Sequence, residues 1–106
     1  MPVRSFIEFH VREDAVDAFE RAYLENGFLH KAVEAPGFLG GEFLKKSTTP
    51  PIYAATALWR TAADYAAWQQ NYGEVFSVDA LKQLGQHLLK QPEGSALSVL
   101  TRVPEE

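Results

Sequence analysis

The order of hydrophobic periodicities along this chain constrains its fold more than any other feature. Alternation of apolar and polar residues over 3–11 predicts a first strand, and helical spacing over about 14–34 predicts a first helix. Two more strands are predicted at 38–46 and 52–60. A turn over 47–51, which contains two threonines and two prolines, joins them.

The second half of the chain continues with helical segments and then a strand. Thr61, with Asp64 three residues later, resembles the N-terminal cap of a short helix. Residues 71–73 are expected to form an irregular connection, and leucines at helical spacing over 78–90 predict a further helix. A final strand is predicted at 96–103. The order is therefore β-α-β-β-α-β, with the second helical section in two pieces.

Gly27 lies inside the first helical pattern and leaves two outcomes open. A glycine in a helix interior is less favourable than alanine by roughly 1 kcal/mol. The helix can therefore run on to Glu34, or it can kink or end early at Asn26 and Gly27. Pro36 and Gly37 end the segment in either case.

This order of elements matches the ferredoxin-like α+β fold with a four-stranded antiparallel sheet. Right-handed connections place both helical sections on one face of that sheet. The opposite face, with an area of roughly 500 Å², then has no cover from its own chain, although it carries several apolar side chains. We expect a second copy to pack on it as a homodimer. The alternative is a monomer with a mildly apolar open face.

Composition limits the function further. The 106 residues suffice for one domain, expected to span 1–106, and the net charge is −4. The absence of cysteine excludes disulfides, thiolate metal sites and cysteine nucleophiles. The acidic balance argues against nucleic acid or an anionic membrane as the main partner. No apolar stretch approaches the ~20 residues that span a bilayer, so we expect a soluble, cytoplasmic protein.

Three short motifs resemble the antibiotic biosynthesis monooxygenase family, part of the dimeric α/β-barrel group. They are PGF at 36–38, LWR at 58–60 and ADYAAW at 63–68. The resemblance covers about 3–103 and implies oxidation of a small phenolic or polycyclic compound by O₂, with no flavin, metal or other cofactor. It also implies that the substrate lies between the sheet and the helices of one protomer.

Haem-degrading proteins of the same group resemble the chain less well. Trp68 matches the tryptophan of their functional constellation. Their strand-one asparagine has no counterpart near Ile7 and Glu8, and their histidine falls near Val78. Two of the three groups are missing, so haem binding is the less expected function.

Candidate catalytic groups gather on the inward face of the first helix if that helix is continuous. His30 would then lie one turn from Asn26 and two turns from Tyr23. Because an imidazole titrates near neutral pH, His30 could accept a phenolic proton. The alternative is that His30 is an inert residue at a frayed helix end.

Aromatic side chains of the second helical section are expected to wall the pocket. Trp68 can stack on an aromatic ring, and the Tyr72 hydroxyl can reach the substrate, with Asn71 beside it. The predicted catalytic residues are His30, Asn26 and Tyr72, and the predicted substrate-binding residues are Phe19, Tyr23, Trp68 and Asn71. Each of these aromatic residues could equally serve only to fill the core.

The three histidines do not indicate a metal site. His10, His30 and His87 lack the short spacing of metal ligands. His10 and Glu8 share the strand face assigned to the dimer, where a polar contact between protomers is the simpler interpretation. A dimeric module that binds a small ligand or regulates without catalysis remains the alternative to a monooxygenase.

Overall fold

The computed structural model describes residues 1–104, and its elements follow the predicted ferredoxin-like order. The strands are β1 (Val3–His10), β2 (Phe38–Lys46), β3 (Ile52–Trp59) and β4 (Glu93–Ser98). The helices are α1 (Val16–Glu25), α2 (Ala62–Val75) and α3 (Val78–Gly85), and the short 3₁₀ segments are η1 (Glu13–Ala15) and η2 (His30–Glu34). The predicted fold class is confirmed.

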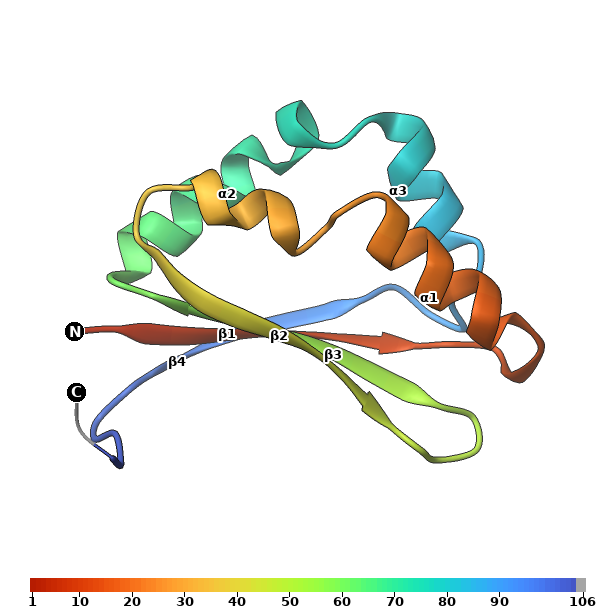
Figure 1. Cartoon of the computed structure of the whole chain (residues 1–106), viewed down its shortest axis with the longest axis horizontal. Helices are drawn as coiled ribbons and strands as arrows, with labels where there is room; N and C mark the ends of the chain where they lie inside the picture. Colours follow the sequence, from red (N-terminus) through yellow and green to blue (C-terminus); the bar gives the residue numbers. More distant parts are fainter. Residues whose placement is uncertain (105–106) are drawn as a thin grey trace.

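The four strands form one antiparallel sheet in the order β2-β3-β1-β4. Figure 1 shows the three helices on one side of this sheet and the C-terminal tail on the other. β1 and β3 occupy the centre, so their helix-facing residues form the floor of the core. The helices therefore cover one face only, as the connections predict.

The core lies between the sheet and the helices and is largely aromatic. The alternation predicted for the first strand is confirmed, because Val3 and Phe9 point into the core. From β3, Tyr53 and Trp59 are also fully buried. Phe19 of α1 is 0% exposed, and its ring centre lies 4.9 Å from that of Tyr53. Burial of a phenylalanine side chain contributes about 1.5–3 kcal/mol.

Gly27 ends the first helix, which confirms the early end that its position allowed. α1 stops at Glu25, and Gly27 has a φ of 64°, a left-handed conformation that favours glycine. Asn26 closes the helix, because its side-chain Nδ2 donates to the carbonyl of Ala22 at 2.7 Å. The chain then continues as the 3₁₀ segment η2 and not as the second half of an α-helix.

This break changes which side chains of the following segment point inward. Phe28 and Ala32 are buried, whereas His30 is exposed and Val33 is 66% exposed. The prediction that His30 lies on an inward face with Asn26 is therefore wrong. The prediction continued the helical rotation of 100° per residue through Gly27. The left-handed backbone of Gly27 breaks that rotation, so the residues after it face other directions.

Several other boundaries differ from the sequence prediction. Residues 71–73 are helical and not irregular, because Tyr72 packs against Phe76 with ring centres 4.7 Å apart and holds the end of α2. α3 ends at Gly85, earlier than predicted. β4 begins and ends earlier than the predicted 96–103, because its ladder with β1 starts at Glu93 and includes Gly94.

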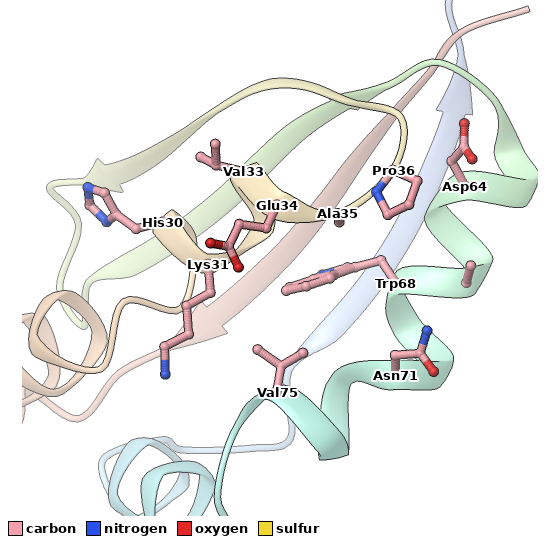
Figure 2. A pocket seen from close by; sticks show the side chains of 11 residues that line it. His30, Lys31, Val33, Glu34, Ala35, Pro36, Asp64, Trp68, Asn71 and Val75 are labelled. Carbon is pink, nitrogen blue, oxygen red and sulfur yellow. The ribbon is translucent and has the colours of Figure 1, made fainter.

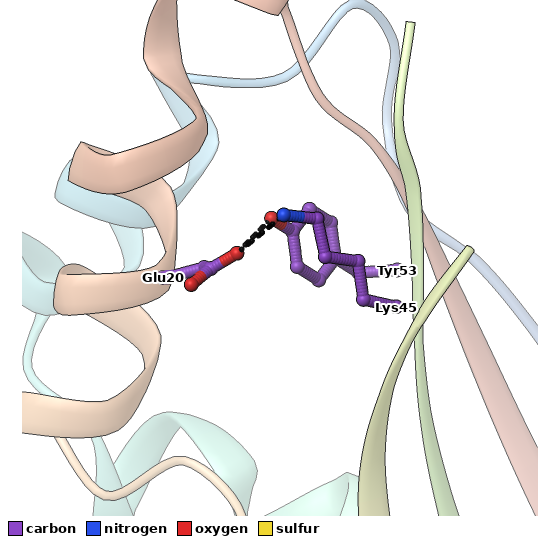
Figure 3. A network of polar contacts seen from close by, with 3 residues as sticks. All are labelled: Glu20, Lys45 and Tyr53. Carbon is purple, nitrogen blue, oxygen red and sulfur yellow. Dashed lines mark hydrogen bonds and ion pairs between the residues drawn. The ribbon is translucent and has the colours of Figure 1, made fainter. Parts of the chain in front are cut away.

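A polar network ties α1 to the sheet, as Figure 3 shows. The Tyr53 hydroxyl donates a hydrogen bond to the Glu20 carboxylate, and Lys45 Nζ lies 3.1 Å from the same carboxylate oxygen. The hydrogen bond from Tyr53, followed by that from Lys45, lowers the pKa of Glu20. Burial raises the pKa of Tyr53 to about 12, so Tyr53 remains the donor. These contacts join α1, β2 and β3.

The sheet face away from the helices carries both apolar and charged side chains. Leu44 of β2 is 46% exposed and Leu97 of β4 is 57% exposed; both line a groove of about 530 Å³ with Phe6. Glu8 of β1 stands directly opposite Glu93 of β4 on this face. The predicted open, partly apolar face is therefore present.

We expect Tyr53→Phe to destabilise the fold in a pH-dependent way. Loss of a hydrogen bond to a partly exposed carboxylate should lower the free energy of unfolding by about 1 kcal/mol at pH 7. The lowered pKa of Glu20 contributes stability above its unfolded-state value, and this contribution is lost as the pH falls through the folded-state value. The deficit of the variant should therefore shrink by pH 3.

Denaturant unfolding at pH 7 and pH 3 measures this deficit. Tyr65→Phe is the matched control, because the Tyr65 hydroxyl accepts from Gln69 and contacts no carboxylate. A Tyr53→Phe deficit that stays the same at both pH values would contradict the assignment.

Candidate functional site

A cleft of about 780 Å³ opens between η2 and α2 (Figure 2). Its volume is within the range of small-molecule sites. The residues that line it are His30, Lys31, Val33, Glu34, Ala35 and Pro36 from η2 and the loop that follows, and Asp64, Ala67, Trp68, Asn71 and Val75 from α2.

Trp68 forms the inner wall of this cleft. Figure 2 shows its indole extending from α2 toward η2, between Glu34 and Val75. The ring is held from behind by Trp59, at 6.1 Å between ring centres, and by Tyr72, edge to face at 5.7 Å. Trp68 is half-buried, so it packs in the core and also presents ring surface to the cleft.

The start of α2 is fixed against the loop before β2, which closes one end of the cleft. Thr61 caps the helix by accepting from the backbone N–H of Asp64 at 3.1 Å, as predicted. Gly37 has a φ of 82°, and a Cβ at this position would lie 2.2 Å from the Asp64 carboxylate. Arg60 donates its backbone N–H to the carbonyl of Gly37 at 2.8 Å, and its side chain pairs with Asp64 at 3.5 Å.

The polar residues of the cleft differ from those that the sequence suggested. His30 and Asn71 line it, but the His30 ring points away from Trp68 in Figure 2. Lys31 and Glu34 were not predicted from the sequence, because a continuous helix places them on the outer side. The sequence pattern assigned Asp64 only to a helix cap. Its position one turn before Trp68 on the same helix could also have indicated that it lines the cleft.

A second, smaller cavity lies deeper, between the helices and the sheet. This inner void has a volume of about 40 Å³, and its lining includes Tyr23, Phe28, Trp68 and Tyr72. Among residues 1–104, Trp68 alone lines both the inner void and the cleft. Trp68 therefore separates the two spaces.

The seven predicted site residues are thus divided among four places. His30, Asn71 and Trp68 line the cleft, and Tyr23, Tyr72 and again Trp68 line the inner void. Asn26 is held at the end of α1 by Ala22 and lines neither space. Phe19 is enclosed in the core, away from both.

Burial controls the protonation of the two tyrosines of the inner void. It raises the pKa of Tyr23, and the nearby Tyr72 raises it further. Burial also raises the pKa of Tyr72 to about 12. Both phenols therefore stay protonated at neutral pH and can act as hydrogen-bond donors.

Comparison with known families identifies the class of protein that this fold and site define. Residues 2–73 match the family model for antibiotic biosynthesis monooxygenase. Because this match covers more than half of the chain, the protein belongs to the antibiotic biosynthesis monooxygenase family, as its motifs predicted. No curated protein sequence matches the chain.

Solved structures share the whole fold at low sequence identity. A candidate antibiotic biosynthesis monooxygenase from Nitrosomonas europaea is 16% identical, with a TM-score of 0.74 over 99% of this chain and 94% of its own. SnoaB, a cofactor-independent oxygenase from Streptomyces nogalater, is 18% identical, with a TM-score of 0.72 over 98% of each chain. A dimeric ferredoxin-like protein from an uncultured marine organism is 12% identical, with a TM-score of 0.77 over 99% and 92%.

Residues 1–104 contain no group of three or more histidine, aspartate or glutamate side chains placed to hold a metal ion. No helix within the same residues has both the length and the apolar character that a membrane crossing requires.

Proposed function

We propose that this protein is a cofactor-independent monooxygenase that oxidises a small aromatic or polyphenolic compound with O₂. The observation that carries the proposal is the apolar cleft walled by Trp68, in a chain of the antibiotic biosynthesis monooxygenase family. Trp68 presents an aromatic face on which a planar substrate can stack. SnoaB, which shares the fold, is a cofactor-independent oxygenase and supports the same reading.

The chemistry needs little from the protein. A phenol that has lost its proton is electron-rich and can itself reduce O₂. At an activated CH₂ group, one oxygen atom becomes the new carbonyl and the other leaves as water, and the substrate supplies all four electrons. The protein then has to exclude water, accept a proton and stabilise the developing anion.

We assign the proton acceptor to His30 and the aromatic platform to Trp68. His30 stands at the mouth of the cleft, where its imidazole can exchange a proton with solvent. Asn71 lines the same cleft and can donate to a substrate oxygen. Asn26 and Phe19 have no part in this assignment, because neither lines a cavity of the site.

We further propose that a second copy covers the open face of the sheet. The groove of about 530 Å³ and the exposed Leu44 and Leu97 give that face apolar surface that a second copy can bury. Glu8 and Glu93 stand opposite each other there, and basic residues on the same face, such as Lys46, offer pairing across a two-fold axis. The marine ferredoxin-like protein that shares the fold is dimeric.

A non-catalytic ligand-binding module is the second candidate. It is favoured by the direction of the His30 ring, which points away from Trp68. Such a module predicts that an aromatic ligand raises the melting temperature without any uptake of O₂.

Blocking the cleft should impair turnover. In Ala67→Trp an indole projects into the cleft from an exposed position of α2, so KM for the aromatic substrate should rise at least about tenfold. Anthrone-like compounds, which carry an activated CH₂ group, are incubated anaerobically with the protein, O₂ is admitted, and quinone formation is followed.

Ala66→Trp is the matched control for this variant. Ala66 is exposed on the same helix and lines neither the cleft nor the inner void. Quinone formation no faster than without protein, across the whole set of compounds, would overturn the monooxygenase assignment. Equal effects of the two variants would overturn the choice of cleft.

His30→Gln should lower kcat about 10–100-fold. The expected loss is small for a general base because the His30 side chain is exposed. His87→Gln is the control, because His87 lines neither the cleft nor the inner void. Full activity in His30→Gln would exclude His30 as the proton acceptor.

Leu97→Glu should prevent dimerisation, because it places a charge in the groove of the open face that a second copy would bury. Sedimentation should give twice the monomer mass for the wild type and the monomer mass for the variant. Val78→Glu, at an exposed apolar position of α3, should leave the dimer intact. A monomeric wild type at high concentration would refute the dimer.

A further inference from the structure

The inner void is too small for the substrate that the cleft can take. A cavity of about 150 Å³ is needed to hold a benzene ring, and the inner void has about 40 Å³. A water molecule needs roughly 10–15 Å³ by the same kind of measure. The void therefore has room for molecules of two or three atoms, directly behind the Trp68 wall.

The walls of the inner void are mostly apolar, which suits a gas better than water. Phe9, Phe28 and Ala57 are among the side chains that surround it. Two of its polar groups are already engaged. Ser5 Oγ accepts from Trp59 Nε1 at 3.1 Å, and the Tyr65 hydroxyl accepts from Gln69 at 2.9 Å. Apolar cavities of proteins stay dry and take up apolar molecules such as xenon.

Two hydroxyls of the lining remain without a partner. Within residues 1–104, the hydroxyls of Tyr23 and Tyr72 form no hydrogen bond with the protein. Tyr23 is only 4% exposed, and it interacts electrostatically with Tyr72. Neither oxygen is a fully buried unpaired atom, because His87 Nδ1 is the one such side-chain atom within residues 1–104. Both hydroxyls therefore face accessible space and can donate to a molecule that enters the void.

We propose that the inner void binds dioxygen and that Tyr23 and Tyr72 donate hydrogen bonds to it once it carries negative charge. This inference rests on the proposed monooxygenase function. The deprotonated substrate in the cleft gives one electron to O₂, which leaves a substrate radical and superoxide. The two radicals then combine into a carbon–oxygen bond, so no other reductant is required.

Trp68 determines where the two reactants meet. It is the wall that the cleft and the inner void share, so a rotation of its indole joins the two spaces. Oxygen held behind Trp68 then enters beside a substrate stacked on the other side. The phenols stay protonated, as burial raises the pKa of Tyr72 to about 12.

Xenon tests the site without any turnover. Crystals of the wild-type protein under xenon pressure should show xenon between Phe28, Ala57 and Tyr72. Ala57→Val adds two methyl groups to the wall of the void and should remove that peak. Ordered water in the void that xenon fails to displace, or xenon at other places only, would overturn the proposal.

Oxygen kinetics test the two donors. Tyr23→Phe and Tyr72→Phe should each lower kcat/KM for O₂ about 10–100-fold and leave KM for the aromatic substrate within about twofold. Tyr53→Phe is the control, because the Tyr53 hydroxyl binds Glu20 and lies outside both spaces. This control should keep the wild-type dependence on O₂.

The outcomes separate this inference from the function on which it rests. Wild-type turnover together with unchanged O₂ dependence in Tyr23→Phe and Tyr72→Phe would overturn the inference alone. A wild-type protein that oxidises none of the compounds would overturn both, whether or not xenon enters the void.

Discussion

The left-handed backbone at Gly27 is the constraint on which the site depends. It stops α1 and turns the chain, so that Phe28 and Ala32 enter the core while the other side of η2 is left to face outward. That outward side becomes one wall of the cleft, and α2 supplies the other. A side chain at position 27 would have room but would be strained by the positive φ. One backbone angle thus decides which residues of η2 pack and which are available to a ligand.

The aromatic residues behind the cleft form a connected wall and not a set of separate pairs. Ring contacts run from Trp59 through Trp68 to Tyr72 and Phe76, and Phe76 in turn packs on Phe28 with ring centres 4.6 Å apart. α2 is therefore held to both the sheet and the chain after α1. Interiors packed in this way resist deformation. Trp68 is the half-buried member of this wall at the boundary between the two spaces, and the rings behind it are packed more tightly.

The fold could be predicted from the sequence, because alternation and helical spacing record which side of each element faces the core. β1 and β3 follow the predicted alternation, and the chain order determines the layer arrangement. The site was less predictable. His30 was placed by carrying a helical phase across Gly27, and a single dihedral angle invalidates that extrapolation. Asp64 and Glu34 were overlooked, because their place beside the cleft depends on how η2 packs against α2. No local pattern encodes that relation.

The two edges of the sheet bear on how copies of this chain can associate. β2, at one edge, carries Lys45 and Lys46 and has a register irregularity near Gly40. β4, at the other edge, is only six residues long and carries Glu93 and Gly94. Lysines, irregular pairing and short length all discourage an additional strand from joining a sheet. The addition of further strands, and so of further copies, is therefore disfavoured at both edges of the sheet. A contact through the open face, in contrast, joins two copies and leaves no equivalent face free for a third.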